Sequence, residues 1–147
     1  MKNWFKRQPS DGRKGQAVVE FALILPVFVL LVFGAIELGR AYYVKHLLTN
    51  AAREGARVGS LPNQLEADVH DRIQEFLTGV GLGGTWGYSV VVKNPAGVLR
   101  TGGLVNAIAG DRVTVTITYT FQVLVGTVIP GFTGNVPLNN SCTFRHE

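Results

Sequence analysis

The first apolar stretch of the chain is long and unbroken. From Gln16 to Ile36 there are 21 residues, and the only charged one among them is Glu20. At 1.5 Å of rise per residue, a helix of this length extends about 31 Å, close to the thickness of the hydrocarbon core of a bilayer. A helix of a soluble domain is normally polar along one side, and this stretch is apolar all round. The pattern predicts a transmembrane helix, which we place at residues 16–39.

Helical spacing continues beyond the predicted span, over residues 40–59. Small and apolar residues return on one stripe, while most charged residues fall elsewhere. The stripe contains Ala41, Val44, Leu48, Ala51, Ala52, Gly55, Ala56 and Gly59. Its last members, Ala52, Gly55, Ala56 and Gly59, allow another backbone to approach closely. Two partners fit this stripe: the sheet of the same chain, or a neighbouring subunit.

A second, shorter helix is predicted after a break at residues 60–63. Its apolar face is formed by Leu65, Val69, Ile73, Phe76 and Leu77, and its other face is charged. Asn63 followed by Glu66 resembles a capping box at the start of this helix. A glycine-rich run beginning at Gly79 is expected to end it.

From Tyr88 onward the period changes to two, which indicates strands. We expect a strand at 88–93, a turn at 94–97, the start of a return strand at 98–100, and a final strand at 138–145, with an apolar loop at 128–132. The clearest strand is 111–124. Its expected core face is Val113, Val115, Ile117, Tyr119 and Phe121, and its expected solvent or partner face is Thr114, Thr116, Thr118 and Thr120. Two helical pieces followed by three to four strands predict an α+β domain with a small antiparallel sheet.

Charge is distributed unevenly along the chain. The net charge is +4, and residues 1–14 account for all of it with five basic residues and one acidic residue. This excess immediately precedes the predicted span, which places the N-terminus in the cytoplasm and the later domain outside. We therefore divide the chain into a basic cytoplasmic leader at 1–15, the transmembrane helix at 16–39 and an extracytoplasmic domain at 40–147. A basic arm for nucleic acid would leave the span unexplained, so we expect no nucleic-acid partner.

The sequence shows no recognised catalytic or metal-binding pattern. The three histidines are scattered, and Glu66, Asp68, Asp71 and Asp111 have no spacing that pairs them for acid–base chemistry. We therefore predict no catalytic residues, no metal, no cofactor and no small-molecule substrate. The single cysteine, Cys142, excludes an intramolecular disulfide and is expected to be a buried free thiol, with pairing between chains as the alternative.

One short motif stands at the start of the span. Gly15 is followed by four residues, then by Glu20-Phe21 and the apolar run. This is the pattern that prepilin peptidases cut, here between Gly15 and Gln16, which would make Glu20 the fifth residue of the mature protein. The alternative role for Glu20 is a carboxylate that reaches the cytoplasmic headgroups.

These features together resemble TadE-like proteins, pilin-like components of the tight-adherence (Tad, or Flp) pilus system. The resemblance rests on Gly15 with Glu20-Phe21, Pro26 within the span, Gly39-Arg40, Ala51-Ala52-Arg53, Gly55-Ala56-Arg57, the strand alternating Val and Thr, and the closing Arg145-x-Glu147. Its most specific part is residues 15–58. The resemblance implies a pilin-like fold and no enzymatic activity. It also implies that the fifth-residue carboxylate pairs with the new α-amino group of Gln16 on the same or a neighbouring chain.

The resemblance further implies a function and a set of partners. The expected function is that of a pseudopilin or minor pilin in the bacterial inner membrane, or at the cell surface as part of the pilus. The implied partners are the membrane, a prepilin peptidase, the Tad inner-membrane platform with its secretion ATPase, and other pilins or a second TadE-like subunit. The alternative is a membrane-anchored extracytoplasmic binding or sensor domain whose leader is not cleaved. An anchored enzyme is a third class, for which the sequence offers no paired acid–base groups.

Overall fold

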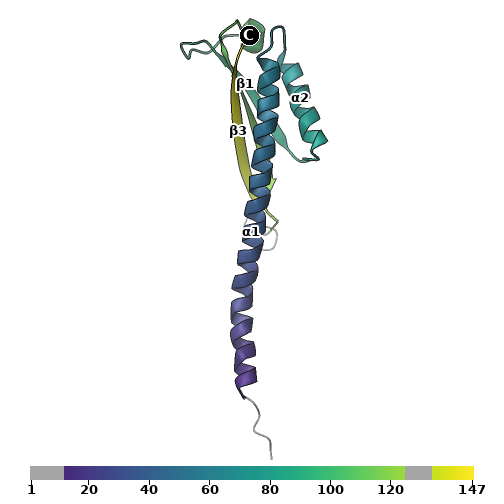
Figure 1. Ribbon diagram of the computed structural model, residues 1–147, viewed down its shortest axis with the longest axis vertical. Coiled ribbons are helices and arrows are strands. Elements are labelled where there is room, and N and C mark those ends of the chain that lie inside the picture. Colours follow the sequence, from purple (N-terminus) through teal and green to yellow (C-terminus); the bar gives the residue numbers. More distant parts are fainter. Residues whose placement is uncertain (1–11, 125–133) are drawn as a thin grey trace, which may run out of the picture. The chain divides into compact units, whose positions relative to one another are not determined.

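The computed structural model describes residues 12–124 and 134–147 (Figure 1). Most of the predicted leader and the predicted apolar loop at 128–132 lie outside the described residues. The elements are α1 (Gly12–Gly59), α2 (Glu66–Gly79), β1 (Trp86–Lys93), the short 3-10 helix η1 (Gly103–Asn106), β2 (Arg112–Gln122) and β3 (Asn135–Arg145). The chain divides into two compact units between Ile36 and Glu37.

The first unit consists of the N-terminal part of α1. Pro26 lies inside the helix, which continues on both sides of it although proline removes one backbone donor. The side chains of residues 17–33 are exposed, and most of them are large and apolar. An apolar surface of this kind is not stable in water, so this part of α1 requires a lipid or protein environment.

The second unit is an α+β domain with a three-stranded antiparallel sheet in the order β1-β2-β3. Val115 in the central strand lies opposite Val90 of β1 and Cys142 of β3. Figure 1 shows α2 beside the C-terminal half of α1, and β3 along that half. The predicted fold class, with a long first helix, a short second helix and a small antiparallel sheet, is confirmed.

The core of the domain lies between the sheet and the two helices. Val113, Val115 and Ile117 of β2 are fully buried, as are Leu48, Ala51, Ala52 and Ala56 of α1 and Val69 and Ile73 of α2. The predicted alternation of β2 is confirmed for these valines and the isoleucine, and Phe121 is also buried. Tyr119 is only half-buried, since its hydroxyl reaches outward to donate to the carbonyl oxygen of Gly83 at 2.9 Å. Thr118 is exposed, and Thr114, Thr116 and Thr120 are partly exposed.

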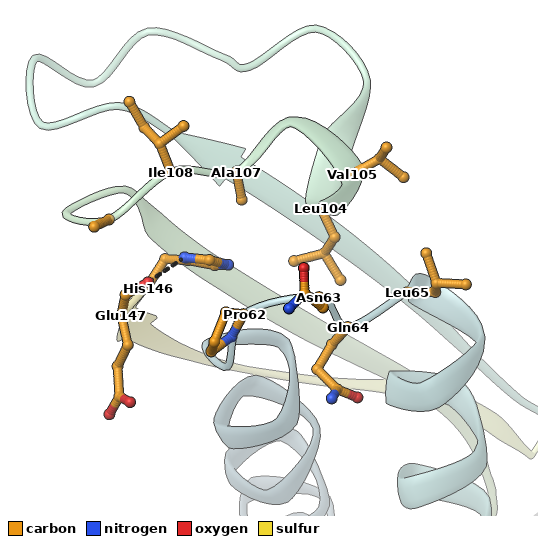
Figure 2. Close-up of a pocket in the computed structure, with 11 residues that line it drawn as sticks. Pro62, Asn63, Gln64, Leu65, Leu104, Val105, Ala107, Ile108, His146 and Glu147 are labelled. Atoms are coloured by element: carbon orange, nitrogen blue, oxygen red, sulfur yellow. Dashed lines mark hydrogen bonds between the residues drawn. The ribbon is translucent and has the colours of Figure 1, made fainter.

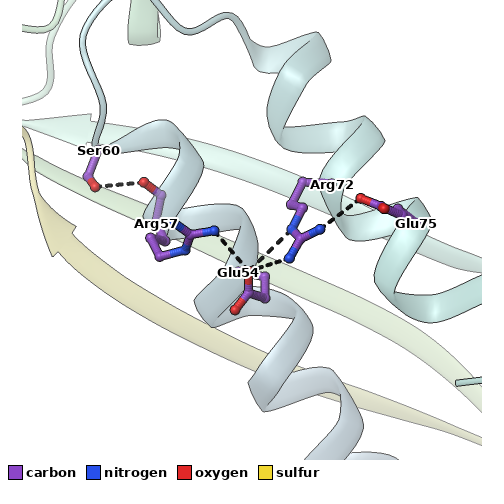
Figure 3. A network of polar contacts seen from close by, with 5 residues as sticks. All are labelled: Glu54, Arg57, Ser60, Arg72 and Glu75. Atoms are coloured by element: carbon purple, nitrogen blue, oxygen red, sulfur yellow. Dashed lines mark hydrogen bonds and ion pairs between the residues drawn. The ribbon is translucent and has the colours of Figure 1, made fainter. Parts of the chain in front are cut away.

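An ion-pair network joins α2 to α1 at the rim of this core (Figure 3). Arg72 of α2 donates to Oε2 of Glu54 on α1 through Nε at 3.2 Å and Nη2 at 2.9 Å. The same guanidinium donates to Glu75 through Nη1 at 2.8 Å. The hydrogen bond from Arg72 lowers the pKa of Glu54, and the nearby Arg57 guanidinium acts in the same direction. The network therefore sets the position of α2 along α1 while Val69, Ile73 and Leu77 supply the apolar contact.

The predicted cap of the second helix is wrong. The helix begins at Glu66, and its N-terminus is closed by Asp68, whose carboxylate accepts the backbone N–H of Leu65 at 2.7 Å. Asn63 instead adopts a left-handed turn with φ of 61°, a conformation that asparagine tolerates better than most residues. Leu65, which was placed on the apolar face, is exposed because it precedes the first helical turn.

The predicted return strand at 98–100 is reduced to one isolated bridge between Lys93 and Leu99. The backbone N–H of Arg100 still donates to the carbonyl oxygen of Val92 at 2.9 Å, and the chain then leaves the edge of β1 for the loop that leads to η1. Gly97, in the turn at 94–97, has φ of 87°, which glycine adopts without a steric cost. The prediction that the helix ends at Gly79 is confirmed.

Candidate functional site: the long helix and its junction with the domain

The four residues of the predicted cleavage motif lie on the first turns of α1. The amide nitrogen Nε2 of Gln16 donates to Oε1 of Glu20 at 3.0 Å, one helical turn away. Phe21 is 63% exposed, and a Cβ on Gly15 would meet no atom within 4 Å other than those of the adjoining helix backbone and its two chain neighbours. The first four N–H groups of any helix lack helical partners, so unwinding at Gly15 breaks few hydrogen bonds. The Gly15–Gln16 bond is therefore accessible, and Glu20 has a polar neighbour on its own helix.

The helix is long and apolar enough to cross a membrane, by length and composition. The apolar side chains between Val18 and Ile36 are exposed on every side of it. This single N-terminal apolar helix suggests membrane anchoring. Tyr42 and Tyr43 follow the apolar stretch and are also exposed, as aromatic side chains at a membrane interface are.

Glu37 ties the start of the domain to the end of its central strand. The residue is only 8% exposed, and its carboxylate accepts two hydrogen bonds from Nη1 of Arg40, at 2.9 and 3.0 Å. It also accepts the backbone N–H of Leu124 at 3.1 Å, and the Arg40 guanidinium lies 5.2 Å from the ring centroid of Phe121. Glu37 is not among the site residues predicted from the sequence. The sequence pattern that could have indicated its role is a lone carboxylate at the end of an apolar run, with an arginine three residues later.

The stripe of small residues faces the core of the same domain. Ala52 and Ala56 are fully buried, and Gly55 and Gly59 are buried with them. A Cβ on Gly55 would stand 2.9 Å from two carbons of Ile73, and one on Gly59 would stand 3.1 Å from Val113. Of the two partners expected for this stripe, the chain's own sheet and second helix therefore occupy it. Contacts with other subunits have to use other surfaces.

A pocket of about 520 Å³ lies at the end of the domain where α1 turns into the second helix (Figure 2). Apolar residues form much of its wall, among them Pro62, Leu104 and Ile108, and His146 and Glu147 border it. His146 is buried, and its backbone N–H donates to the carbonyl oxygen of Asp111. The pocket is open to solvent and has few polar groups directed at one point, so it lacks the features of a catalytic site.

The titratable side chains that come together in the described part of the chain form ion pairs, such as Arg72 with Glu54, and not a metal-binding cluster. Within residues 12–124 and 134–147, no group of three His, Cys, Asp or Glu side chains is placed to hold a metal ion. His46 packs edge-on against Tyr42 and His70 stacks on Trp86, so both make ordinary aromatic contacts. Cys142 is a free thiol and is half-buried, less deeply than expected.

The described residues define a class of protein: a long N-terminal helix, apolar and exposed over its first part, that continues into a small α+β domain. Residues 15–57 match the model of the TadE family, described as TadE-like protein. The match confirms the resemblance over this helical segment and relates the chain to the Tad pilus system. No curated protein and no solved structure matches the chain.

Proposed function

We propose that the chain is a non-enzymatic pilin-like subunit that serves the assembly of a Tad/Flp-type adhesive pilus. The observation that carries this proposal is α1 itself. One continuous helix carries an exposed apolar surface at one end and forms the core of a folded domain at the other. The family match covers this same helix and begins at Gly15.

The proposed mechanism is assembly through the helix. A prepilin peptidase cuts between Gly15 and Gln16, and the new α-amino group of Gln16 pairs with Glu20 of the same or a neighbouring chain. In a poorly hydrated place an isolated charge is unfavourable, so only the register in which both charges meet is stable. The exposure of Gly15, Gln16, Glu20 and Phe21 supports this role, because all four are available to another protein.

The proposed topology is a single span in the bacterial inner membrane with the leader in the cytoplasm and the domain outside. The charge excess of residues 1–14 supports this orientation. The proposed partners are the peptidase, the Tad platform and other pilins or a second TadE-like subunit.

The decisive experiment is a mass measurement of the N-terminus in native membranes, combined with deletion of the chain. We expect the native protein to begin at Gln16 and the deletion to abolish pili. The proposal is contradicted if the native protein begins at Met1 and the deletion strain still makes pili.

The second candidate is a membrane-anchored binding or sensor domain with an intact leader. The pocket beside Leu104 and Ile108 favours it, since an open hollow of about 520 Å³ with both apolar and polar walls can hold a small ligand. This candidate predicts an uncleaved N-terminus and normal piliation after deletion, so the same experiment separates the two functions.

A further inference from the structure

The open face of the sheet, which the helices leave uncovered, ends in a row of three positive charges. Lys93 of β1 lies directly opposite Arg112 of β2, and Arg112 lies directly opposite Arg145 of β3. Their neighbours Val92 and Val113 are buried, so the three basic residues lie on the other face, and all three are exposed. Like charges directly opposite each other destabilise a sheet. Within the described residues, none of the three forms an ion pair with a carboxylate.

The row Lys93–Arg112–Arg145 is held in place by the fold, and there is space beside its charges for a partner. Nη2 of Arg112 donates to the carbonyl oxygen of Pro95 at 2.8 Å, which holds the central guanidinium in place. Beside it, Arg112, Thr143 and Arg145 border a hollow of about 400 Å³ that opens to solvent. An unfavourable arrangement of charges that the fold keeps in place is characteristic of a binding surface, where a partner removes the repulsion.

The complementary charge lies on the opposite side of the same domain. The solvent face of α2 carries Asp68, Asp71 and Glu75, while Val69, Ile73 and Leu77 face the core. Only Glu75 of these three acids is paired with an arginine, and the side chain of Asp71 is 79% exposed. One side of the domain is therefore acidic and the other, at the end of the sheet, is basic.

Both charged surfaces lie at the same level along α1. A Cβ on Gly59 would contact Val113, the neighbour of Arg112, at 3.1 Å and Val69, the neighbour of Asp68, at 3.3 Å. Arg112 and Asp68 are therefore each next in sequence to a residue that packs against the same turn of α1. Two copies held with parallel helices would bring the acids of one to the basic row of the next without a shift along the helix.

We infer that the row Lys93–Arg112–Arg145 binds the acidic face of α2 of a second copy of this chain. The two surfaces differ, so the contact is head-to-tail and extends into an open row of copies instead of closing as a dimer. Exposed ion pairs are weak and screened by salt, but anchoring in a shared membrane raises the effective concentration of the partner surface. The inference deepens the proposed function, on which it rests, by naming a lateral contact between domains.

The test uses thiol crosslinking of the full chain in membranes. Cys142→Ser removes the native thiol, and Ala67→Cys and Thr143→Cys introduce one thiol next to each charged surface. A bifunctional thiol reagent is expected to give a ladder of dimers, trimers and larger products, because each copy carries both halves of a head-to-tail contact. A single dimer band, or no crosslinked product, overturns the inference.

Charge reversal identifies the residues in this background. Arg145→Glu and Asp71→Lys should each lower the crosslinking yield about five-fold, as loss of a pair worth about 1 kcal/mol predicts, and the two together should restore it. Arg53→Glu is the control, since Arg53 is exposed and lies on α1 away from the sheet, and it should leave the yield unchanged. The inference is overturned if Arg53→Glu lowers the crosslinking yield as much as the test variants do, or if Arg145→Glu leaves the yield unchanged. It is also overturned by a ladder that forms only after an acidic polysaccharide or nucleic acid is added.

A stability measurement separates lost contact from lost fold. Arg145→Glu places an acid opposite Arg112, so the melting temperature of the domain should rise by about 1–4 °C while crosslinking falls. The proposed function is read independently from piliation and from the native N-terminus. If pili depend on the chain but no ladder of crosslinked products forms, only this contact is refuted. If the ladder forms but pili do not depend on the chain, only the pilus role is refuted.

Discussion

The guanidinium of Arg100 holds the fully buried carboxylate of Asp111 through two parallel hydrogen bonds. Nε donates to Oδ2 at 2.7 Å and Nη2 donates to Oδ1 at 3.1 Å. The backbone N–H of Ile108 donates to Oδ2 at 3.1 Å, and the carbonyl oxygen of Asp111 accepts the N–H of His146. Asp111 thus connects the loop before β2, through Arg100 and Ile108, with the segment after β3, through His146.

This arrangement predicts a dependence of stability on acid. The hydrogen bond from Arg100 lowers the pKa of Asp111 below its ordinary value of 3.8. A carboxyl group whose pKa is lower in the folded state stabilises the fold above its unfolded pKa, and this stabilisation is lost as the pH falls through the folded value. The melting temperature of the wild type should therefore decrease when the pH is lowered below about 4. Asp111→Asn should be less stable than the wild type at neutral pH and should not show the decrease that is due to protonation of Asp111. Melting curves from pH 2 to pH 7 test this, and parallel curves for both proteins contradict it.

The close contact at Gly55 predicts that a side chain there is destabilising. Gly55→Val would press on Ile73 and Val115, which are both fully buried, and should lower the free energy of unfolding by about 2 kcal/mol. Gly39→Val is the matched control on the same helix, since nothing lies within 4 Å of its Cβ position. Chemical denaturation followed by tryptophan fluorescence measures both. Similar free energies for the two variants would show that the core has room at Gly55.

The two faces of β2 predict opposite responses to exchanging valine and threonine. Val115→Thr buries a hydroxyl group in an apolar core and should cost about 1–3 kcal/mol of stability. Thr116→Val changes the open face and should leave the free energy of unfolding within about 0.5 kcal/mol of wild type. The same denaturation experiment decides between them, and a larger loss for Thr116→Val would mean that this face is the buried one.

Gly15 and Glu20 should fail at different steps. A peptidase that fits closely around the backbone at the cut leaves no room for a large side chain, so Gly15→Leu should leave a full-length precursor. Glu20→Ala keeps the proposed cut site and removes the carboxylate that we propose pairs with the new amine, so processing should persist while piliation is lost or strongly reduced. The span should still insert, because deleting a charge lowers the cost of insertion. Intact mass spectrometry measures processing, and electron microscopy measures pili.

Glu20→Gln refines the role of this residue. It should behave like Glu20→Ala where the charge itself is needed, and like the wild type where a polar acceptor is sufficient. Normal numbers of pili with Glu20→Ala contradict the proposed pairing altogether.

A fusion reporter checks the proposed orientation. A periplasmic enzyme fused after Glu147 should be active, because the basic residues before the span favour a cytoplasmic N-terminus. The same enzyme fused to the leader should be inactive. Activity of a reporter that functions only in the cytoplasm, fused after Glu147, would contradict this orientation.

Local sequence patterns are sufficient to predict most of the elements and the faces that they bury. An unbroken apolar run, a stripe at helical spacing and the alternation of β2 are local patterns, and burial of apolar surface acts on them wherever the chain folds. The long helix, the second helix, the central strand and the buried row of Val113, Val115 and Ile117 were therefore predictable. The family match agrees with the part of the chain whose motifs are local, residues 15–57.

Which of these elements pack together, and in what register, depends on contacts between distant parts of the chain. The return strand predicted at 98–100 is a single bridge, and the cap of α2 is provided by Asp68 and not by Asn63. Contacts such as Glu37 with Leu124, or Lys93 beside Arg112, join residues that are far apart in sequence, and no local pattern encodes them. Their positions follow from how the apolar faces pack together, because the geometry of the shared core fixes the register of every strand and helix that closes it.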